Sequence, residues 1–368
     1  MSERKMITAT YLVDTEAPKE ALNAICRGQT VGNPSLLTRY ETKEFLNRWS
    51  AKGRSLTQTH VDGLSIMEIR FPQSNFGSEG LSYLLSVLMG GQCDIDVIRG
   101  CRLIKLDLGT FAQRFPGPRY GIQGIRERLG IPDRPLVGGI VKPKIGLNPR
   151  AYAAVVQEMA EGGCDVIKED EILANQPWCR MRERLELIAP IIRDHPILYL
   201  ICGTSDGGEP YQAKAQKVRD LGPGFGFHLN IWSGIGSYLD FRRHSERPLF
   251  FQKSGDKVFT TGPFAIEGHV LYQLLHLAGC DAGHIGMYGG YLSESVGVLT
   301  QRIQAFGQSL PSFSCGLNPT LAREIVRIFG RDVLLMSGGW MHSQPQGLRW
   351  AIHQLKEAAN AHQSTGAV

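Results

Sequence analysis

The feature that most restricts the fold of this chain is a series of eight short apolar runs after residue 135. They cover residues 136–143, 164–170, 197–203, 225–232, 248–252, 282–287, 312–316 and 333–339. Between them, the apolar spacing predicts helices over residues 149–163, 210–222, 263–279, 295–308 and 320–330. Eight strand–helix units over about 250 residues are what a closed (β/α)8, or TIM, barrel requires, so we predict this α/β architecture. A doubly wound open sheet, which usually has fewer strands, is the alternative.

The first third of the chain has a different pattern and predicts a separate domain. Strand-like runs cover residues 7–14, 63–72 and 97–108, and helical patterns cover residues 17–28 and 79–91. This order is typical of a small sheet covered by helices on one face, so we predict a ferredoxin-like α+β domain. The segment 111–121 is rich in proline and glycine and predicts the domain boundary. We therefore expect the N-terminal domain over residues 1–115 and the barrel over residues 116–368.

Composition, charge and the lack of targeting segments predict a globular, cytoplasmic protein. The chain contains 42% apolar and 20% charged residues, and its net charge of +5 is dispersed along the sequence. A nucleic-acid-binding protein usually has a denser basic stripe, so we expect no nucleic-acid partner. No segment approaches the roughly 20 apolar residues of a membrane span, and the N-terminus lacks the apolar run of a signal peptide. The eight cysteines form no CxxC pair, and a chain of this length does not need disulfides.

Polar residues and glycines gather where the predicted barrel strands end. Catalytic groups of such barrels lie at the carboxyl ends of the strands. In this chain those ends carry Lys142, Lys144, Lys168, Asp170, Glu171, His284, Ser314, Gly316, Gly338 and Gly339. Packing alone does not explain polar residues at so many successive strand ends, so we predict the active site there.

Two pairs of charged residues at these ends suggest metal and proton chemistry. Asp170 and Glu171 offer oxygen ligands that Mg²⁺ accepts, and their place after a strand favours a metal site over a solvated acidic loop. Lys142 and Lys144 flank a proline. A lysine near other cations or in an apolar pocket can act as a base, although two exposed lysines at a strand end are the simpler interpretation.

Two glycine-containing segments follow the last two predicted strands, at residues 314–319 and 337–340. Barrels often bind phosphate at this place through backbone N–H groups that glycine leaves accessible. Tight turns between strand and helix explain the same glycines equally well, so the sequence leaves both interpretations open.

Taken together, these motifs resemble one family. The segments KPKIGL (142–147), GGCDVIKEDEIL (162–173), HIGMYGGYLSE (284–294), SCG (314–316) and SGGWMHSQPQG (337–347) occur in the order and spacing of the ribulose bisphosphate carboxylase (RuBisCO) large-chain superfamily. The resemblance extends over the whole chain, including the N-terminal domain, and is to the RuBisCO-like, type IV members.

The resemblance implies a metal site and a proton-transfer site. Lys168 would be carbamylated by CO₂, and its carbamate would join Asp170 and Glu171 in holding Mg²⁺. Lys142 would be the proton-transfer base, supported by Lys144. The resemblance also assigns phosphate or substrate contacts to Gly316, Gly338, Gly339, His284, Ser314 and Lys253.

Departures from the family pattern argue against carboxylation. Tyr291 stands where the carboxylase has a lysine, and Phe250, Gln252 and Lys253 replace a His-x-His-Arg cluster. Lysine in place of arginine weakens bidentate phosphate binding, so we expect a substrate with one phosphate. Further matching positions of the carboxylase are occupied by Asp256, Gly28, Asn33, Pro34 and Gln92.

We therefore expect an enolising isomerase and not a carboxylase. The resemblance favours the isomerisation of 5-methylthioribulose 1-phosphate to 1-methylthioxylulose 5-phosphate by a 1,3-proton transfer, in methionine salvage. A 2,3-diketo-5-methylthiopentyl-1-phosphate enolase is an alternative, but Gln92 cannot replace the basic lysine expected there. A decarboxylase of a branched oxo-sugar phosphate and a non-catalytic sugar-phosphate-binding protein are further alternatives. The resemblance also implies a homodimer or a multiple of dimers.

Overall fold

The computed structural model describes residues 5–32 and 36–361 and divides into two compact units. The first consists of Met1–Pro116 and Gly255–Leu277, and the second of Gly117–Ser254 and Ala278–Val368. The predicted division after residue 115 did not include the return of residues 255–277 to the first unit. None of the helices in the described part of the chain is long and apolar enough to cross a membrane.

The first unit is built on a five-stranded sheet with the order β10-β4-β1-β3-β2. Alternate residues of β1 are buried, from Ile7 to Val13, as expected for a sheet with one covered face. The strands are β1 (Met6–Asp14), β2 (Lys52–Gln58), β3 (Leu64–Pro72), β4 (Gly100–Asp107) and β10 (Phe264–Ile266). The helices are α1 (Pro18–Gly28), α2 (Lys43–Trp49), α3 (Leu81–Leu88), α9 (Lys257–Thr260) and α10 (Gly268–Leu277).

Two strands of this sheet do not follow from the sequence pattern. The predicted strands and helices are present as β1, β3, β4, α1 and α3, but β2 is polar and almost wholly exposed. β10 lies in the segment 263–279, which the sequence predicts to be entirely helical, and it pairs parallel with β4. Pairing with a neighbouring strand therefore decides the conformation of Phe264–Ile266.

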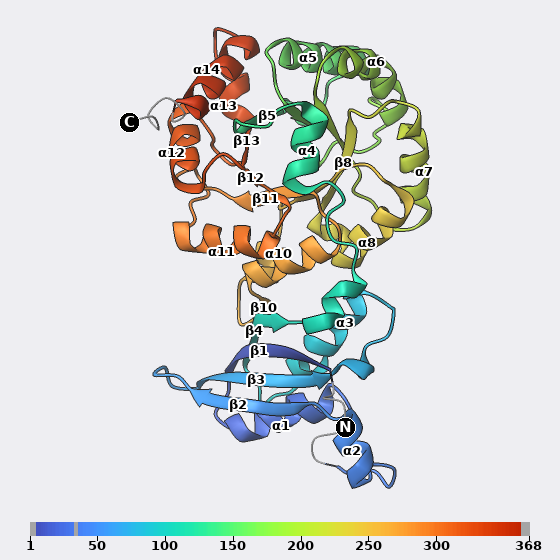
Figure 1. Ribbon diagram of the computed structural model, residues 1–368, viewed down its shortest axis with the longest axis vertical. Helices are drawn as coiled ribbons and strands as arrows, with labels where there is room; N and C mark the ends of the chain where they lie inside the picture. Colours follow the sequence, from blue (N-terminus) through green and yellow to red (C-terminus); the bar gives the residue numbers. More distant parts are fainter. Residues whose placement is uncertain (1–4, 33–35, 362–368) are drawn as a thin grey trace. The chain divides into compact units, whose positions relative to one another are not determined.

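The second unit is a closed barrel of eight parallel strands, which confirms the predicted architecture (Figure 1). The strand order is β11-β12-β13-β5-β6-β7-β8-β9, and every strand overlaps one predicted run. The strands are β5 (Leu136–Ile140), β6 (Val166–Lys168), β7 (Leu198–Cys202), β8 (Phe225–Asn230), β9 (Leu249–Gln252), β11 (Ala282–Gly286), β12 (Leu310–Phe313) and β13 (Leu334–Ser337). The helices are α4 (Gly121–Leu129), α5 (Pro149–Glu161), α6 (Met181–Asp194), α7 (Glu209–Arg219), α8 (Ile235–His244), α11 (Val296–Phe306), α12 (Pro319–Phe329), α13 (Gly339–His342) and α14 (Leu348–Asn360).

The amino-terminal half of the barrel interior is a packed apolar core. Side chains from the first residues of the strands, among them Leu136, Val166 and Leu334, form one buried cluster with Ile125 of α4. The packing is close enough to require glycine at position 138, because a Cβ there would lie 2.7 Å from the Val166 carbonyl oxygen and 2.3 Å from the Met336 sulfur. The barrel interior is therefore filled by apolar side chains at this end.

Buried carboxylates stabilise the amino ends of the strands through hydrogen bonds and ion pairs. The Asp281 carboxylate accepts hydrogen bonds from Arg242 Nη2 at 2.7 Å and from the backbone N–H groups of Leu249 at 2.8 Å and Tyr120 at 2.6 Å. Asp165 similarly accepts from both terminal nitrogens of Arg134, each at 2.6 Å. Groups at this end of a barrel contribute to stability and not to catalysis.

Replacing Asp281 with alanine should lower the free energy of unfolding by about 3–5 kcal/mol, because the change leaves the Arg242 guanidinium buried without its counter-charge. Urea unfolding followed by tryptophan fluorescence measures this loss. The exposed Asp194→Ala, at the end of α6, is the matched control and should stay within about 0.5 kcal/mol of the wild type. Equal stability of the two variants would contradict the role given to Asp281.

Candidate active site

The lysine that ends strand β6 is entirely buried at the centre of the predicted site. Lys168 is 0% exposed, and its Nζ donates to the Glu169 carbonyl oxygen at 2.9 Å. Burial lowers the pKa of Lys168, although Glu171 and Asp170 favour its charged form. The unprotonated amine, which is the form that reacts with CO₂, is therefore more populated here than on a solvated lysine.

Two carboxylates and two further lysines lie beside Lys168. The Asp170 side chain is 1% exposed and forms an ion pair with Lys142 Nζ at 2.5 Å. Glu171 Oε1 lies 3.0 Å from the Ser254 hydroxyl and 4.0 Å from Lys144 Nζ. Burial opposes ionisation of Glu171, but Lys168 and Ser254 help to hold its pKa at about 2. The structure thus brings the predicted metal and proton-transfer residues into one cluster, while their chemical roles stay predictions.

This cluster lacks a complete set of ordinary metal ligands. Among residues 5–32 and 36–361, no group of three or more histidine, cysteine, aspartate or glutamate side chains is placed to hold a metal ion. Asp170 and Glu171 supply two carboxylates, and a carbamate on the neighbouring Lys168 amine would add a third. The donor set therefore fits Mg²⁺ once Lys168 carries a carbamate.

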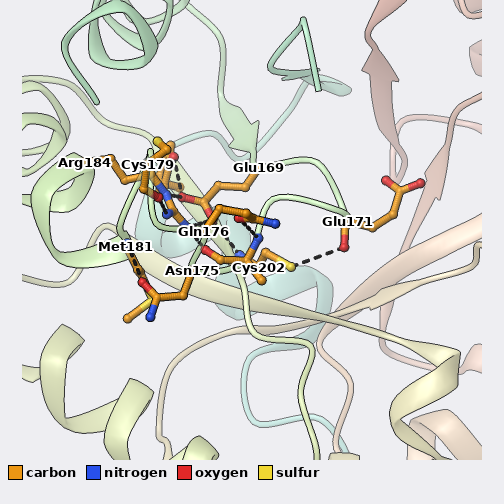
Figure 2. A network of polar contacts seen from close by, with 10 residues as sticks. Glu169, Glu171, Asn175, Gln176, Cys179, Met181, Arg184 and Cys202 are labelled. Carbon is orange, nitrogen blue, oxygen red and sulfur yellow. Dashed lines mark hydrogen bonds and ion pairs between the residues drawn. The ribbon is translucent and has the colours of Figure 1, made fainter. Parts of the chain in front are cut away.

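Glu169 lies between Lys168 and Asp170 in the sequence. Its side chain points away from the candidate site and forms a buried ion pair with Arg184 (Figure 2). Its carboxylate accepts from Arg184 Nε at 2.6 Å and Nη2 at 2.8 Å, and from the Tyr199 hydroxyl at 3.0 Å. The backbone N–H of Cys202 donates to it at 2.9 Å. The side chains of Glu169 and Arg184 are both 0% exposed. The buried charge of either residue would therefore be strongly destabilising without the opposite charge of the other.

Arg184 also holds the loop that carries the acidic residues. Its guanidinium donates to the carbonyl oxygens of Cys179 at 2.9 Å and Ala174 at 2.7 Å. The Cys202 thiol donates to the Glu171 carbonyl oxygen at 3.5 Å, while the Glu171 carboxylate points away from this network (Figure 2). Sequence reasoning missed Arg184, since a charged residue on a helix ordinarily faces solvent.

His284 and Ser314 lie in the same barrel but are largely enclosed. His284 on β11 is 2% exposed, and its Nδ1 lies 3.1 Å from the Ser312 hydroxyl oxygen. Burial, with the nearby charge of Lys168, lowers the pKa of His284 well below its usual value. The imidazole is therefore neutral, so any phosphate contact it makes is a hydrogen bond and not an ion pair. Ser314 is 7% exposed and Lys253, at the end of β9, is 8% exposed.

The three glycines predicted to bind phosphate have different surroundings. A Cβ on Gly316, whose φ is 97°, would lie 3.0 Å from the Tyr291 ring, and a Cβ on Gly338 would lie 3.1 Å from Lys142 Cε. These two glycines make room for neighbouring side chains, which explains them without a ligand. Nothing lies within 4 Å of a Cβ built on Gly339, so its backbone has open space beside it.

The positions that depart from the carboxylase pattern are divided between the two units. Tyr291 is 86% exposed in the loop after β11. Gln92 is buried in the first unit, where it bonds to Gln29 and to the Leu88 carbonyl oxygen. Gly28 ends α1 and Asp256 belongs to the first unit, whereas Asn33 and Pro34 lie outside the described residues.

Comparisons with known proteins define the family. Residues 121–300 match the model of the ribulose bisphosphate carboxylase large chain, catalytic domain. The chain is 30% identical to an uncharacterized ribulose bisphosphate carboxylase-like protein of Bordetella bronchiseptica, over 98% of this chain and 93% of that protein. It therefore belongs to the RuBisCO large-chain family, among relatives that include RuBisCO-like proteins.

Two further relatives show how varied the family is. A 3-oxo-isoapionate-4-phosphate decarboxylase of Rhizobium etli is 28% identical over 97% of this chain and 93% of that protein. The octameric RuBisCO of Pyrococcus horikoshii superposes with a TM-score of 0.89 at 25% identity, covering 99% of this chain and 89% of that one. The family is enzymatic, and it contains both carboxylases and enzymes of other reactions.

Disrupting the Glu169–Arg184 pair should destabilise the barrel and loosen the loop after β6. Glu169→Gln or Arg184→Met alone should lower the free energy of unfolding by about 3–5 kcal/mol, because each leaves one buried charge unpaired. The double variant should lose less than the sum of the two. Urea unfolding and the rate of proteolysis between residues 170 and 180 measure these effects. Arg182→Met, which removes an 80% exposed partner of Glu186 on the same helix, is the control and should leave the stability close to that of the wild type.

Proposed function

We propose that this protein is a metal-dependent enzyme that forms an enol or enediolate from a sugar monophosphate and does not fix CO₂. The observation that supports this most directly is the close grouping of Lys142, Lys168, Asp170 and Glu171, with Lys142 2.5 Å from Asp170. This grouping lies at the carboxyl ends of β5 and β6, where catalytic groups of such barrels are found.

The metal we propose is Mg²⁺, held by Asp170, Glu171 and a carbamate on Lys168. When bound, it would polarise a carbonyl group and the hydroxyl beside it, which acidifies the neighbouring carbon. The chain's own contribution is to keep the Lys168 amine out of water, at 0% exposure, and to hold Asp170 and Glu171 on a loop fixed by Arg184. A preorganised pocket of this kind lowers the cost of arranging charges during the reaction.

The two lysines after β5 would transfer protons. Lys142 is one-quarter exposed and pairs with Asp170, so it can deliver a proton to a carbon held beside that carboxylate. Lys144 is half-exposed, near Glu171, and can exchange protons with solvent. Tyr291, at the position of the carboxylase lysine, carries no cation to steady a carboxylated product, which supports a reaction without carboxylation.

Of the reactions open to such a site, we favour the decarboxylation of a phosphorylated oxo-sugar acid. Loss of CO₂ from a 3-oxo acid leaves an enolate, which needs a proton donor and no base. The Lys142–Asp170 ion pair supplies an ammonium group suited to that role. The relative from Rhizobium etli that carries a decarboxylase name is similar over nearly the full length of both chains, which also supports this choice.

A second candidate is the isomerisation of 5-methylthioribulose 1-phosphate. This reaction removes a proton from one carbon and returns it to another, so it requires a proton-carrying group near both positions. The observation that favours it is the presence of two lysines, Lys142 and Lys144, beside the two carboxylates. For either reaction we propose a dimer or a multiple of dimers, since relatives of this fold are named as dimeric and octameric.

Replacing Lys168 with alanine should abolish metal-dependent turnover. The loss should exceed about 100-fold, since even changes beyond the direct ligands of a metal typically cost about 10–100-fold. Turnover and Mn²⁺ binding are measured with and without added bicarbonate, and the wild type should depend on it. Lys217→Ala, an exposed change on α7, is the control. A Lys168→Ala variant with wild-type turnover would show that the proposed mechanism is wrong.

Substrate profiling in D₂O separates the two reactions. A decarboxylase should release CO₂ and place one deuterium on the carbon that carried the carboxylate. The isomerase should release no CO₂ and place deuterium on the carbon that receives the transferred proton. Product NMR and CO₂ detection across oxo-sugar acid phosphates and 5-methylthioribulose 1-phosphate give the answer. Thermal stabilisation by these compounds without any turnover would instead favour a non-catalytic binding protein.

A further inference from the structure

Two side chains at the end of strand β9 form a hydrogen-bonded chain that ends on Glu171. Gln252, the last residue of β9, is 6% exposed, and its Nε2 donates to the Ser254 hydroxyl oxygen at 2.8 Å. The Ser254 hydroxyl donates to Glu171 Oε1 at 3.0 Å. This contact joins the end of β9 to the loop after β6, which are far apart in the sequence.

The direction of these hydrogen bonds follows from the chemistry of the three groups. An ionised carboxylate only accepts, so the single hydrogen of the Ser254 hydroxyl is used on Glu171. The serine oxygen must then accept from Gln252, which requires the amide nitrogen, and not the amide oxygen, to face Ser254. The orientation of the Gln252 amide is therefore fixed by the charge on Glu171.

This orientation leaves the amide oxygen as a buried acceptor. Among the residues that the structure describes, none donates a hydrogen bond to Gln252 Oε1. A buried carbonyl oxygen without a donor is unfavourable, and native sites of this kind usually receive a donor from a ligand or an ordered water. The oxygen is neutral and accepts only, so it suits a hydroxyl group and disfavours a phosphate or carboxylate.

We propose that Ser254 positions Glu171 for metal binding, and that Gln252 anchors Ser254 while its amide oxygen accepts a hydrogen bond from a substrate hydroxyl. This inference rests on the proposed function and extends it, since it names an uncharged, hydroxyl-bearing part of the substrate as the group recognised at the end of β9. Gln252 is then a specificity-determining residue and Ser254 a positioning residue.

The positioning role is tested by Mn²⁺ binding, followed by electron paramagnetic resonance in bicarbonate buffer, without substrate. Ser254→Ala should bind Mn²⁺ about 10-fold more weakly than the wild type, because Glu171 loses its orienting donor. Ser254→Thr keeps the hydroxyl and should bind like the wild type. Ser86→Ala, which removes an exposed hydroxyl bonded to Ser82 at 3.0 Å on α3, is the matched control.

The substrate contact is tested by steady-state kinetics of Gln252→Met on the substrate found by profiling. The variant keeps the side-chain length but loses both hydrogen-bonding groups, so KM should rise about tenfold, the value of one lost hydrogen bond, with a smaller change in kcat. Its Mn²⁺ affinity should fall less than that of Ser254→Ala, because the Ser254 hydroxyl is still present.

The outcomes distinguish this inference from the proposed function. If the wild type binds Mn²⁺ but Ser254→Ala binds it equally well, or Ser254→Thr binds it as weakly as Ser254→Ala, the positioning role is wrong. An unchanged KM in Gln252→Met overturns the substrate contact alone. If the wild type binds no Mn²⁺ in bicarbonate, or turns over no compound in the panel, the proposed function itself fails, and the part of the inference that depends on it fails too.

Discussion

The buried ion pair between Glu169 and Arg184 is the interaction on which the candidate site depends. Successive residues at the end of β6 face opposite sides, so Lys168 enters the barrel while Glu169 faces the surrounding helices. Arg184 uses its remaining donors on the backbone of the loop that follows. One guanidinium thus balances a buried charge and fixes the segment that holds Asp170 and Glu171, and neither task requires contact with a ligand.

The barrel separates stability from chemistry along its axis. At the amino ends of the strands, carboxylates such as Asp281 are saturated with hydrogen bonds from arginine and backbone groups. At the carboxyl ends, the buried Gln252 Oε1 has no donor among the described residues. Groups whose hydrogen-bonding capacity is already used cannot bind a ligand. The carboxyl ends of the strands, where an acceptor is still available, are therefore the end suited to ligand binding.

The sequence predicted the barrel well because parallel strands covered on both faces appear as continuous apolar runs, as in 225–232 and 333–339. It failed for β2, whose exposed residues carry no apolar pattern, and for β10, which forms only because β4 offers a partner. The expectation that catalytic groups lie at strand ends identified Lys168, Asp170 and Glu171, because it required only their position in the sequence. Arg184 and Ser254 could not be found in this way, because their importance lies in contacts between segments distant in sequence.

The return of residues 255–277 to the first unit affects how the chain can fold during synthesis. The edge of β4 acquires its parallel neighbour only after β5 to β9 have left the ribosome, because β10 follows them in the chain. Contacts between such distant segments form slowly, since a long loop must close before they are made. Until then the backbone of Cys101–Leu103 has no strand on that side, and an unpaired edge can associate with another chain. A fragment that ends at the boundary near residue 116 would keep that edge exposed permanently.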